Sequence, residues 1–255
     1  MNAYLISLCI ILACSVVAWT YSLKIKKVCY VDSLWSLAFI VLSASYLYQT
    51  DYLNLKNIAI FFLVFLWGTR LSIHITIKNW GMPEDDRYQA IRANNEPNFK
   101  YKSLYIIFGL QALLAWLISS TLYYTMQSQP IFQWIDIFAL ILFTVGITFE
   151  SVGDWQLLKF KRITENKNKV LNTGLWKYTR HPNYFGDCCV WWSFYLFSLN
   201  SGHYLTILSP LLMTLLLLKI SGVTLQEKTI SSRRPEYEDY KKMTNTFFPG
   251  PRKRR

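Results

Sequence analysis

The sequence is poor in charge and in the residues that build the common sites of soluble enzymes. Only 16% of its 255 residues are Asp, Glu, Lys or Arg, whereas about a quarter is usual in soluble domains. Its three histidines are scattered and its five cysteines form no Cys-x-x-Cys pair, so we expect neither a disulfide framework nor a metal site. The fingerprints GxGxxG, GxxxxGK[ST], GxSxG and HExxH are also missing, which excludes the Rossmann, P-loop, hydrolase-elbow and zincin chemistries that depend on them.

Long apolar runs take the place of charge, since 53% of the residues are hydrophobic and 17% are aromatic. A membrane-spanning helix needs roughly 20 mostly apolar residues. Seven segments fit, at 4–22, 31–49, 58–77, 103–125, 131–152, 184–200 and 204–222. We therefore expect an all-α, polytopic integral membrane protein. Residues 1–255 are expected to form a single domain, with the motif-bearing half at about 150–250.

Positive charge is concentrated in alternate loops. Lysine and arginine crowd the links after the first, third and fifth segments and the C-terminal tail, whereas Lys56 stands alone on the opposite side. By the positive-inside rule, the N-terminus lies outside and the basic loops and C-terminus are cytoplasmic. The net charge of +12 is thus a sign of topology and of contact with anionic membrane lipid rather than of a nucleic-acid partner.

The stretch GLWKYTRHPNYFGD, residues 174–187, brings a polar cluster to the start of the sixth segment. Pro182 suits the first turn of a helix, and Asn183 and Asp187 would then lie one turn apart on one face. A helix N-terminus flanked by basic residues is a natural anion site. A carboxylate inside a membrane helix is costly and marks a functional site by default, whereas for Lys177 alone a plain juxtamembrane anchor is the favoured interpretation.

Two further groups of polar residues lie at the same side of the membrane. Glu150, Asp154 and Lys161 are spaced four and seven residues apart, so they follow one helical stripe, either as a site or as a network that satisfies itself. Asp32, at the start of the second segment, could pair with Arg70 or act as a catalytic acid.

The link after the third segment and the C-terminal tail each have an interpretation that involves no binding site. In the loop Asn79–Tyr88, the charged residues Glu84, Asp85 and Arg87 could form a solvated turn. The tail around Glu227 could lie on the membrane as an amphipathic segment, or fold back and close over a ligand.

The stretch GLWKYTRHPNYFGD, followed by an apolar segment and a tail ending in RRPEYEDYKKMTNTFFP, resembles the steroid 5α-reductase family and above all its bacterial members. Sterol reductases share the RHPNY-x-GD start of the helix. The resemblance is specific from about Asp154 to Pro249 and looser elsewhere. It implies a seven-helix enzyme, expected to be a monomer in a bacterial inner membrane, that binds NADPH from the cytosol. It also implies reduction of an activated C=C bond in a lipophilic, steroid- or isoprenoid-like substrate.

The resemblance assigns roles to individual positions. Asn183 and Asp187 fall on a motif that contacts the nicotinamide side of the cofactor, and Asp154 matches an acid that bonds the cofactor. Lys161 and Lys169 match basic positions that hold the phosphates. The other positions expected to bind NADPH are Asn79, Arg87, Tyr178, Arg180, His181, Tyr184, Glu227, Arg234 and Tyr237.

Asp32 falls where steroid reductases carry a glutamate that helps to hold the substrate ketone, and Trp67 falls near that glutamate's tyrosine partner. Both are expected to be catalytic, although a tryptophan departs from the steroid-type clamp. The S-adenosylmethionine-dependent isoprenylcysteine and phospholipid methyltransferases share RHP-x-Tyr-x-Gly and are the alternative. Two features favour the reductase: the acid after Gly186, and Asn183 in register with it. In addition, Gln-Glu-Lys at Glu227 has one glutamate where methyltransferases usually have a pair.

Overall fold

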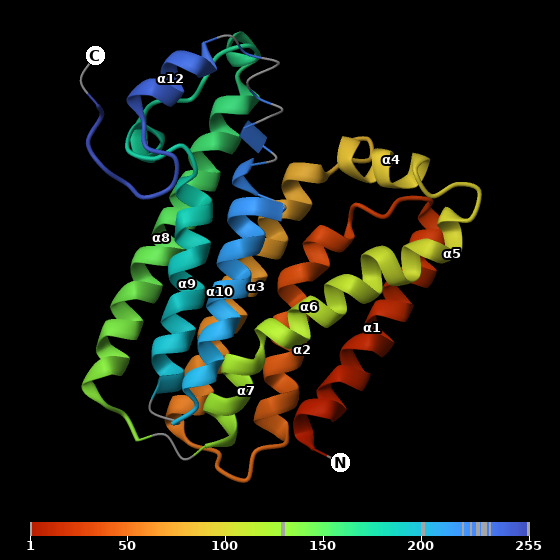
Figure 1. Ribbon diagram of the computed structural model, residues 1–255, viewed down its shortest axis with the longest axis vertical. Coiled ribbons are helices and arrows are strands. Elements are labelled where there is room, and N and C mark those ends of the chain that lie inside the picture. The colour runs from red at the N-terminus through yellow and green to blue at the C-terminus, as the bar shows by residue number, and fades with distance from the viewer. Residues whose placement is uncertain are drawn as a thin grey trace. The chain divides into compact units, whose positions relative to one another are not determined.

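The computed structural model describes residues 2–128, 131–199, 202–220, 222–224, 226–227, 230, 234 and 236–253. Within these ranges every regular element is a helix (Figure 1), which confirms the all-α prediction. The chain divides into two compact units, described one at a time below. The first unit is Met1–Phe132 with Asn200–His203, and the second is Gln133–Leu199 with Tyr204–Arg255.

Five helices are long and apolar enough to cross a membrane, which confirms a polytopic membrane protein. They are α1 (Ala3–Ile25), α2 (Val31–Tyr48), α3 (Leu55–Asn79), the span Phe99–Ile118, and α8 (Trp134–Arg162). The fourth span consists of α5 (Phe99–Ser103), the π-helical η1 (Leu104–Gly109) and α6 (Leu110–Ile118), and α7 (Ser120–Gln127) follows it. The sixth and seventh expected segments are shorter helices: α9 (Pro182–Ser198), and α10 (Leu208–Leu215) continued by the π-helical η6 (Leu216–Ile220).

In the first unit, α2 and α3 approach closely at a glycine. A Cβ on Gly68 would come within 2.9 Å of the Ser36 carbonyl oxygen, and the Ser36 hydroxyl donates to the Gly68 carbonyl at 2.8 Å. Small residues and interhelical hydrogen bonds of this kind drive helix packing in lipid. Beside this crossing, the rings of Phe39 and Trp67 are fully buried and meet edge to face.

A short helix, α4 (Asp86–Ala93), occupies the link between the third and fourth spans. The link is tied to the segment before α2, because Glu84 accepts hydrogen bonds from the Val28 backbone at 2.7 Å and from Arg92 at 2.9 Å. Tyr88 of α4 is 3% exposed and packs into an apolar cluster. The link is therefore docked on its own unit through Glu84, whose side chain is 11% exposed, whereas Asp85 remains 57% exposed, as the solvated turn would have it.

In the second unit, α8 and α9 run side by side (Figure 1). A Cβ on Gly186 would lie 2.4 Å from the backbone nitrogen of Glu150, and one on Gly146 would lie 2.7 Å from the Gly186 carbonyl oxygen. A glycine has no Cβ, so it allows the close approach of a backbone or a ligand. Here it allows the close approach of α8, and this fixes which faces of α8 and α9 meet.

The C-terminal tail folds back over the start of α9. After α12 (Tyr237–Met243), the backbone N–H of Arg180 donates to the Asn245 carbonyl at 2.9 Å, and the N–H of Gly250 donates to the Tyr178 carbonyl at 3.1 Å. Of the two alternatives for the tail, the structure shows the back-folded one. The tail therefore covers the stretch that the sequence singled out.

Candidate functional site

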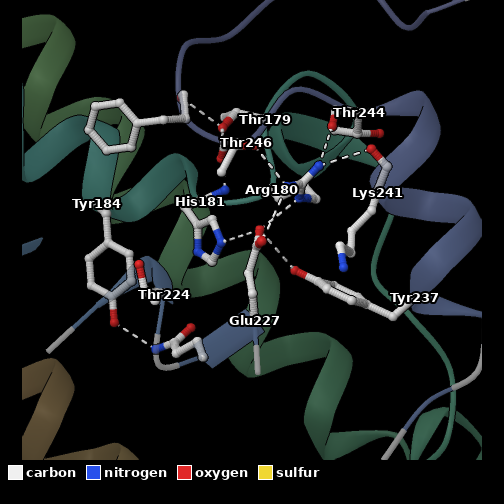
Figure 2. Close-up of polar contacts among 12 residues, drawn as sticks. Thr179, Arg180, His181, Tyr184, Thr224, Glu227, Tyr237, Lys241, Thr244 and Thr246 are labelled. Atoms are coloured by element: carbon white, nitrogen blue, oxygen red, sulfur yellow. Dashed lines mark hydrogen bonds and ion pairs between the residues drawn. The ribbon is translucent and has the colours of Figure 1, made fainter. Parts of the chain in front are cut away.

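Arg180 is the centre of the polar network that joins the tail to α9 (Figure 2). Its Nε donates to Glu227 Oε1 at 2.8 Å and its Nη2 to Oε2 at 3.3 Å, a bidentate pair. Nη1 donates to the carbonyls of Lys241 at 3.0 Å and Thr244 at 2.7 Å, and Nη2 donates to the Thr246 hydroxyl at 2.8 Å. All five N–H donors of the guanidinium thus meet protein acceptors. Arg180, expected to bind cofactor, has no donor left for a phosphate in this arrangement, and we assign it to positioning the tail.

His181 and Tyr237 complete this network, which we call the Arg180–Glu227 hub. His181 Nε2 lies 3.1 Å from Glu227 Oε1, and the Tyr237 hydroxyl donates to the same oxygen at 3.4 Å. The His181 ring is 1% exposed and stacks on Tyr184, whose hydroxyl accepts from Gln226 at 2.6 Å. Several positions that the sequence assigned to the cofactor are therefore brought together, but largely through bonds to one another.

Glu227 stays ionised inside the hub. Burial alone would raise its pKa, but the hydrogen bonds from His181 and Arg180 and their charges outweigh burial and lower the pKa to about 2. Burial, and next the charge of Glu227, raises the pKa of Tyr237 above its ordinary value. At neutral pH the carboxylate is therefore an acceptor for the groups around it, and the phenol remains a donor.

Asn183 and Asp154 form a buried pair between α9 and α8. Asn183 Nδ2 donates to Asp154 Oδ1 at 3.0 Å, and Asp154 is 4% exposed. In the described part of the chain, the buried Asn183 Oδ1 has no hydrogen-bond partner. Asp187, one turn further along α9, is 7% exposed. The sequence prediction that these acids and the amide gather at the start of α9 is consistent with this geometry, and the pair leaves an amide oxygen ready to accept.

A basic cavity of ≈ 370 Å³ opens where α8 ends. Its described lining is Lys161, Arg162, Ile163, Thr164, Asn166, Lys167 and Arg234. Four of these side chains are cationic and none is acidic. Arg234 also donates to the carbonyls of Lys169 at 2.6 Å and Lys167 at 3.2 Å, which joins the tail to this loop. Lys161, expected to hold the phosphates, and Arg234, expected to bind the cofactor, thus line one cavity, whereas Lys169, the other expected phosphate ligand, contributes its carbonyl to Arg234.

In the first unit, Asp32 is held by two neighbouring side chains of α4. The Tyr88 hydroxyl donates to Asp32 Oδ1 at 2.5 Å, and Arg87 Nη2 donates to Oδ2 at 2.8 Å. Gln111 Nε2 donates to the Tyr88 oxygen at 3.3 Å. Burial, followed by the negative charge of Asp32, raises the pKa of Tyr88 above its ordinary value, so the phenol is protonated at neutral pH. The Asp32 side chain is 28% exposed, which leaves the carboxylate within reach of solvent.

The side chains of three further expected residues take no part in the networks described above. Trp67 is 0% exposed in the core between α2 and α3, so its indole has no open face. Asn79 is the last residue of α3, and its carbonyl accepts from the Met82 backbone at 3.1 Å. The Tyr178 ring is 45% exposed beside the hub.

Sequence reasoning missed Tyr88, Gln111, Arg162 and Lys167. Tyr88 could have been found from its position directly after Arg87, which was already a candidate cofactor-binding residue in this loop. Arg162 and Lys167 belong to the basic run KFKRITENKNK, where composition indicates an anion site without indicating which side chains converge.

Comparison with known proteins gives the chain a family. Residues 18–246 match the family DUF1295, described as a protein of unknown function. The chain belongs to the DUF1295 family. This DUF1295 protein is also similar to the uncharacterized protein C594.04c of Schizosaccharomyces pombe, at 24% identity over 278 residues, which covers 97% of this chain and 80% of that relative. No solved structure matches the chain. The matched segment includes every cluster described above.

Proposed function

We propose that this DUF1295 protein is an NADPH-dependent membrane reductase that acts on an activated C=C bond of a lipophilic, steroid- or isoprenoid-like enone. The observation that supports this most is the basic cavity, with four cationic side chains and no acid in its described lining. Such a lining suits the phosphates of a dinucleotide. S-adenosylmethionine, which the alternative methyltransferase would use, has no phosphate and carries a sulfonium cation that four like charges would repel.

The Asn183–Asp154 pair suits the other end of the same cofactor. Asp154 accepts from Asn183 Nδ2, and this leaves the buried Oδ1 free, in the described structure, to accept from a carboxamide NH₂. Asp154 and Lys161 are seven residues apart on α8, about 10 Å along a helix. An extended dinucleotide is long enough to reach from the amide to the basic cavity.

The acid pair of the first unit suits the second half of the reaction. When bound, NADPH supplies a hydride for the β-carbon of the enone. We assign Tyr88 the role of donating a hydrogen bond to the substrate carbonyl oxygen: its single hydroxyl hydrogen would turn from Asp32 to that oxygen and stabilise the negative charge that develops there. Asp32 holds the phenol until the substrate binds and, because it reaches solvent, would relay from water the proton that the α-carbon takes up to balance the hydride. One NADPH and one proton are then consumed for each double bond reduced.

In this proposal Tyr88 takes the place that the sequence gave to Trp67. A phenol beside a carboxylate can polarise a carbonyl, whereas a buried indole cannot supply a proton at neutral pH. The substrate would enter from lipid, and the cofactor would bind from the cytoplasmic side of a bacterial inner membrane, as the distribution of basic loops suggests.

Cofactor choice is the decisive test. Purified protein in detergent should bind NADPH and should not bind S-adenosylmethionine, as measured by calorimetry. Replacing Arg162 and Lys167 together by methionine should weaken NADPH binding at least tenfold, since charge-assisted hydrogen bonds contribute about 1.5–3 kcal/mol each. Lys253→Met, an exposed tail position, is the matched control and should leave the affinity unchanged.

Two results would contradict the proposal in different ways. Binding of S-adenosylmethionine without NADPH would replace the reductase by the methyltransferase. Equal affinities for NADPH and NADH would show that the basic cavity does not hold the 2′-phosphate.

A further inference from the structure

A second cavity, of ≈ 550 Å³, lies in the second unit where the α10–η6 helix ends. Its described lining is Leu218, Lys219, Val223, Thr224, Glu227, Glu238, Lys241 and Thr246. Leu218 and Val223 form an apolar wall at the end of the helix, and the tail adds the polar wall. A cavity that joins an apolar helix end to a polar segment is placed for a ligand that is itself part apolar and part charged.

Most charges in this lining are already compensated. Glu227 accepts from Arg180 and His181, and Lys241 Nζ pairs with Glu238 at 3.1 Å. Within the described residues, Lys219 makes no hydrogen bond and no ion pair. The described lining therefore carries one uncompensated positive charge, which favours an anionic group with a single charge over a polyphosphate.

Lys219 continues a stripe of exposed side chains on the apolar helix α10–η6. Leu211 is 46% exposed and Leu215 is 49% exposed, and each is four residues from the next member of the stripe. Residues four apart lie on one helical face. An acyl chain packed along the two leucines would end beside the ammonium group. Lysines at the ends of membrane helices reach toward the headgroup layer in this way.

We propose that this cavity binds the phosphodiester headgroup of a membrane phospholipid, with Lys219 on the phosphate and an acyl chain along Leu211 and Leu215. The Thr246 hydroxyl accepts from Arg180 and keeps its own hydrogen for the phosphate. Because Thr246 and Glu227 also belong to the Arg180–Glu227 hub, a bound lipid adds contacts to the structure that holds the tail. The proposal does not depend on the reductase activity.

A lipid fits this cavity better than a soluble nucleotide does. The basic cavity at the end of α8 has four cations, whereas this one has a single uncompensated cation and an apolar wall. The phosphate chemistry is shared by both ligands, so the test must separate them by the acyl chains.

The test is native mass spectrometry of delipidated protein titrated with phosphatidylglycerol, whose only charge is its phosphodiester. We expect one adduct of higher affinity than the rest. In Lys219→Met that adduct should weaken about fivefold or more, because one lysine near a membrane surface contributes about 1 kcal/mol. Lys78→Met is the matched control, since Lys78 is also an exposed lysine in the last turn of an apolar helix, α3. It should leave this adduct unchanged.

Three results would overturn the proposal. The first is equal phosphatidylglycerol affinity in Lys219→Met and the wild type. The second is equal binding of glycerophosphoglycerol, the soluble headgroup without acyl chains. The third is displacement of the adduct by NADPH, which would assign the cavity to the nucleotide. If Lys219→Met does not fold, Lys219→Gln removes the charge while keeping a polar side chain, and it is held to the same expectation.

Discussion

Each unit contains an arginine, a carboxylate and a tyrosine in one cluster, but the two clusters are built for different purposes. In the second unit the Arg180 side chain is 7% exposed, and its donors are all bonded to the tail and to Glu227. In the first unit the Arg87 side chain is 32% exposed and the Asp32 side chain 28%. The same residue types can therefore act as a buried clamp in one place and as a site open to solvent in another.

The degree of burial of each ion pair decides how much it contributes to the stability of the fold. Removing one partner of a buried ion pair leaves an uncompensated charge and costs about 3–5 kcal/mol, whereas an exposed pair contributes about 0–1 kcal/mol. We therefore expect the Arg180–Glu227 hub to control stability. The Asp32–Tyr88 pair should control turnover with little effect on stability.

The largest effect is expected for Arg180→Leu, which strands Glu227 and the tail acceptors. The free energy of unfolding should fall by about 3–5 kcal/mol, measured as a loss of melting temperature in detergent and as protease cleavage in the tail. Arg87→Leu is the control from the other cluster and should cost about 1 kcal/mol or less. Similar losses in both variants would show that the two clusters do not differ as their burial indicates.

Turnover should respond to the other cluster. Tyr88→Phe removes one hydroxyl and should lower kcat about 100- to 1000-fold, the usual effect of losing a donor to a developing oxyanion. The measurement is NADPH oxidation with a panel of lipophilic enones. Tyr240→Phe removes the hydroxyl that donates to the Trp176 carbonyl at 2.5 Å, and it should lower stability while leaving kcat unchanged. If Tyr88→Phe keeps wild-type turnover, the pair only docks α4.

Much of the fold could be predicted because it depends on local pattern. Apolar length indicates the spans, and Pro182 marks the start of α9, with His181 as the residue before it. The docked α4 could not be predicted, because its eight residues have no apolar run and the contacts that hold it come from other segments. The π-helical turns of η1 and η6 also leave no mark in composition.

The candidate site also contains some contacts that sequence pattern predicts and others that depend on the tertiary structure. Asn183 and Asp154 were both expected, and their hydrogen bond spans 29 residues between helices that must pack closely at Gly186. Tyr88 was missed because its acceptor Asp32 is 56 positions away, and no pattern in the sequence links the two. Arg180 shows the converse limit, since residue type indicates an anion ligand, whereas only the tertiary structure shows that its acceptors are in the tail.

The charge of Glu227 gives a further contrast, because acid should weaken the Arg180–Glu227 hub. The pKa of Glu227 is lowered to about 2 in the folded protein, whereas a glutamate in an unfolded chain has a pKa of about 4.3. The stabilisation is therefore fully present above pH ~4.3, and it is lost as the pH falls through that value toward about 2, because the unfolded chain then binds a proton that the hub excludes.

Hydrogen exchange of the tail amides should thus show protection that weakens across this window. Glu227→Gln should be less protected at pH 7 and should lack this pH dependence. Glu165→Gln, an exposed position outside the hub, should behave as the wild type. If the wild type and Glu227→Gln lose protection in parallel, the hub is not what holds the tail in acid, and the contrast between a clamp and an open site would rest on geometry alone.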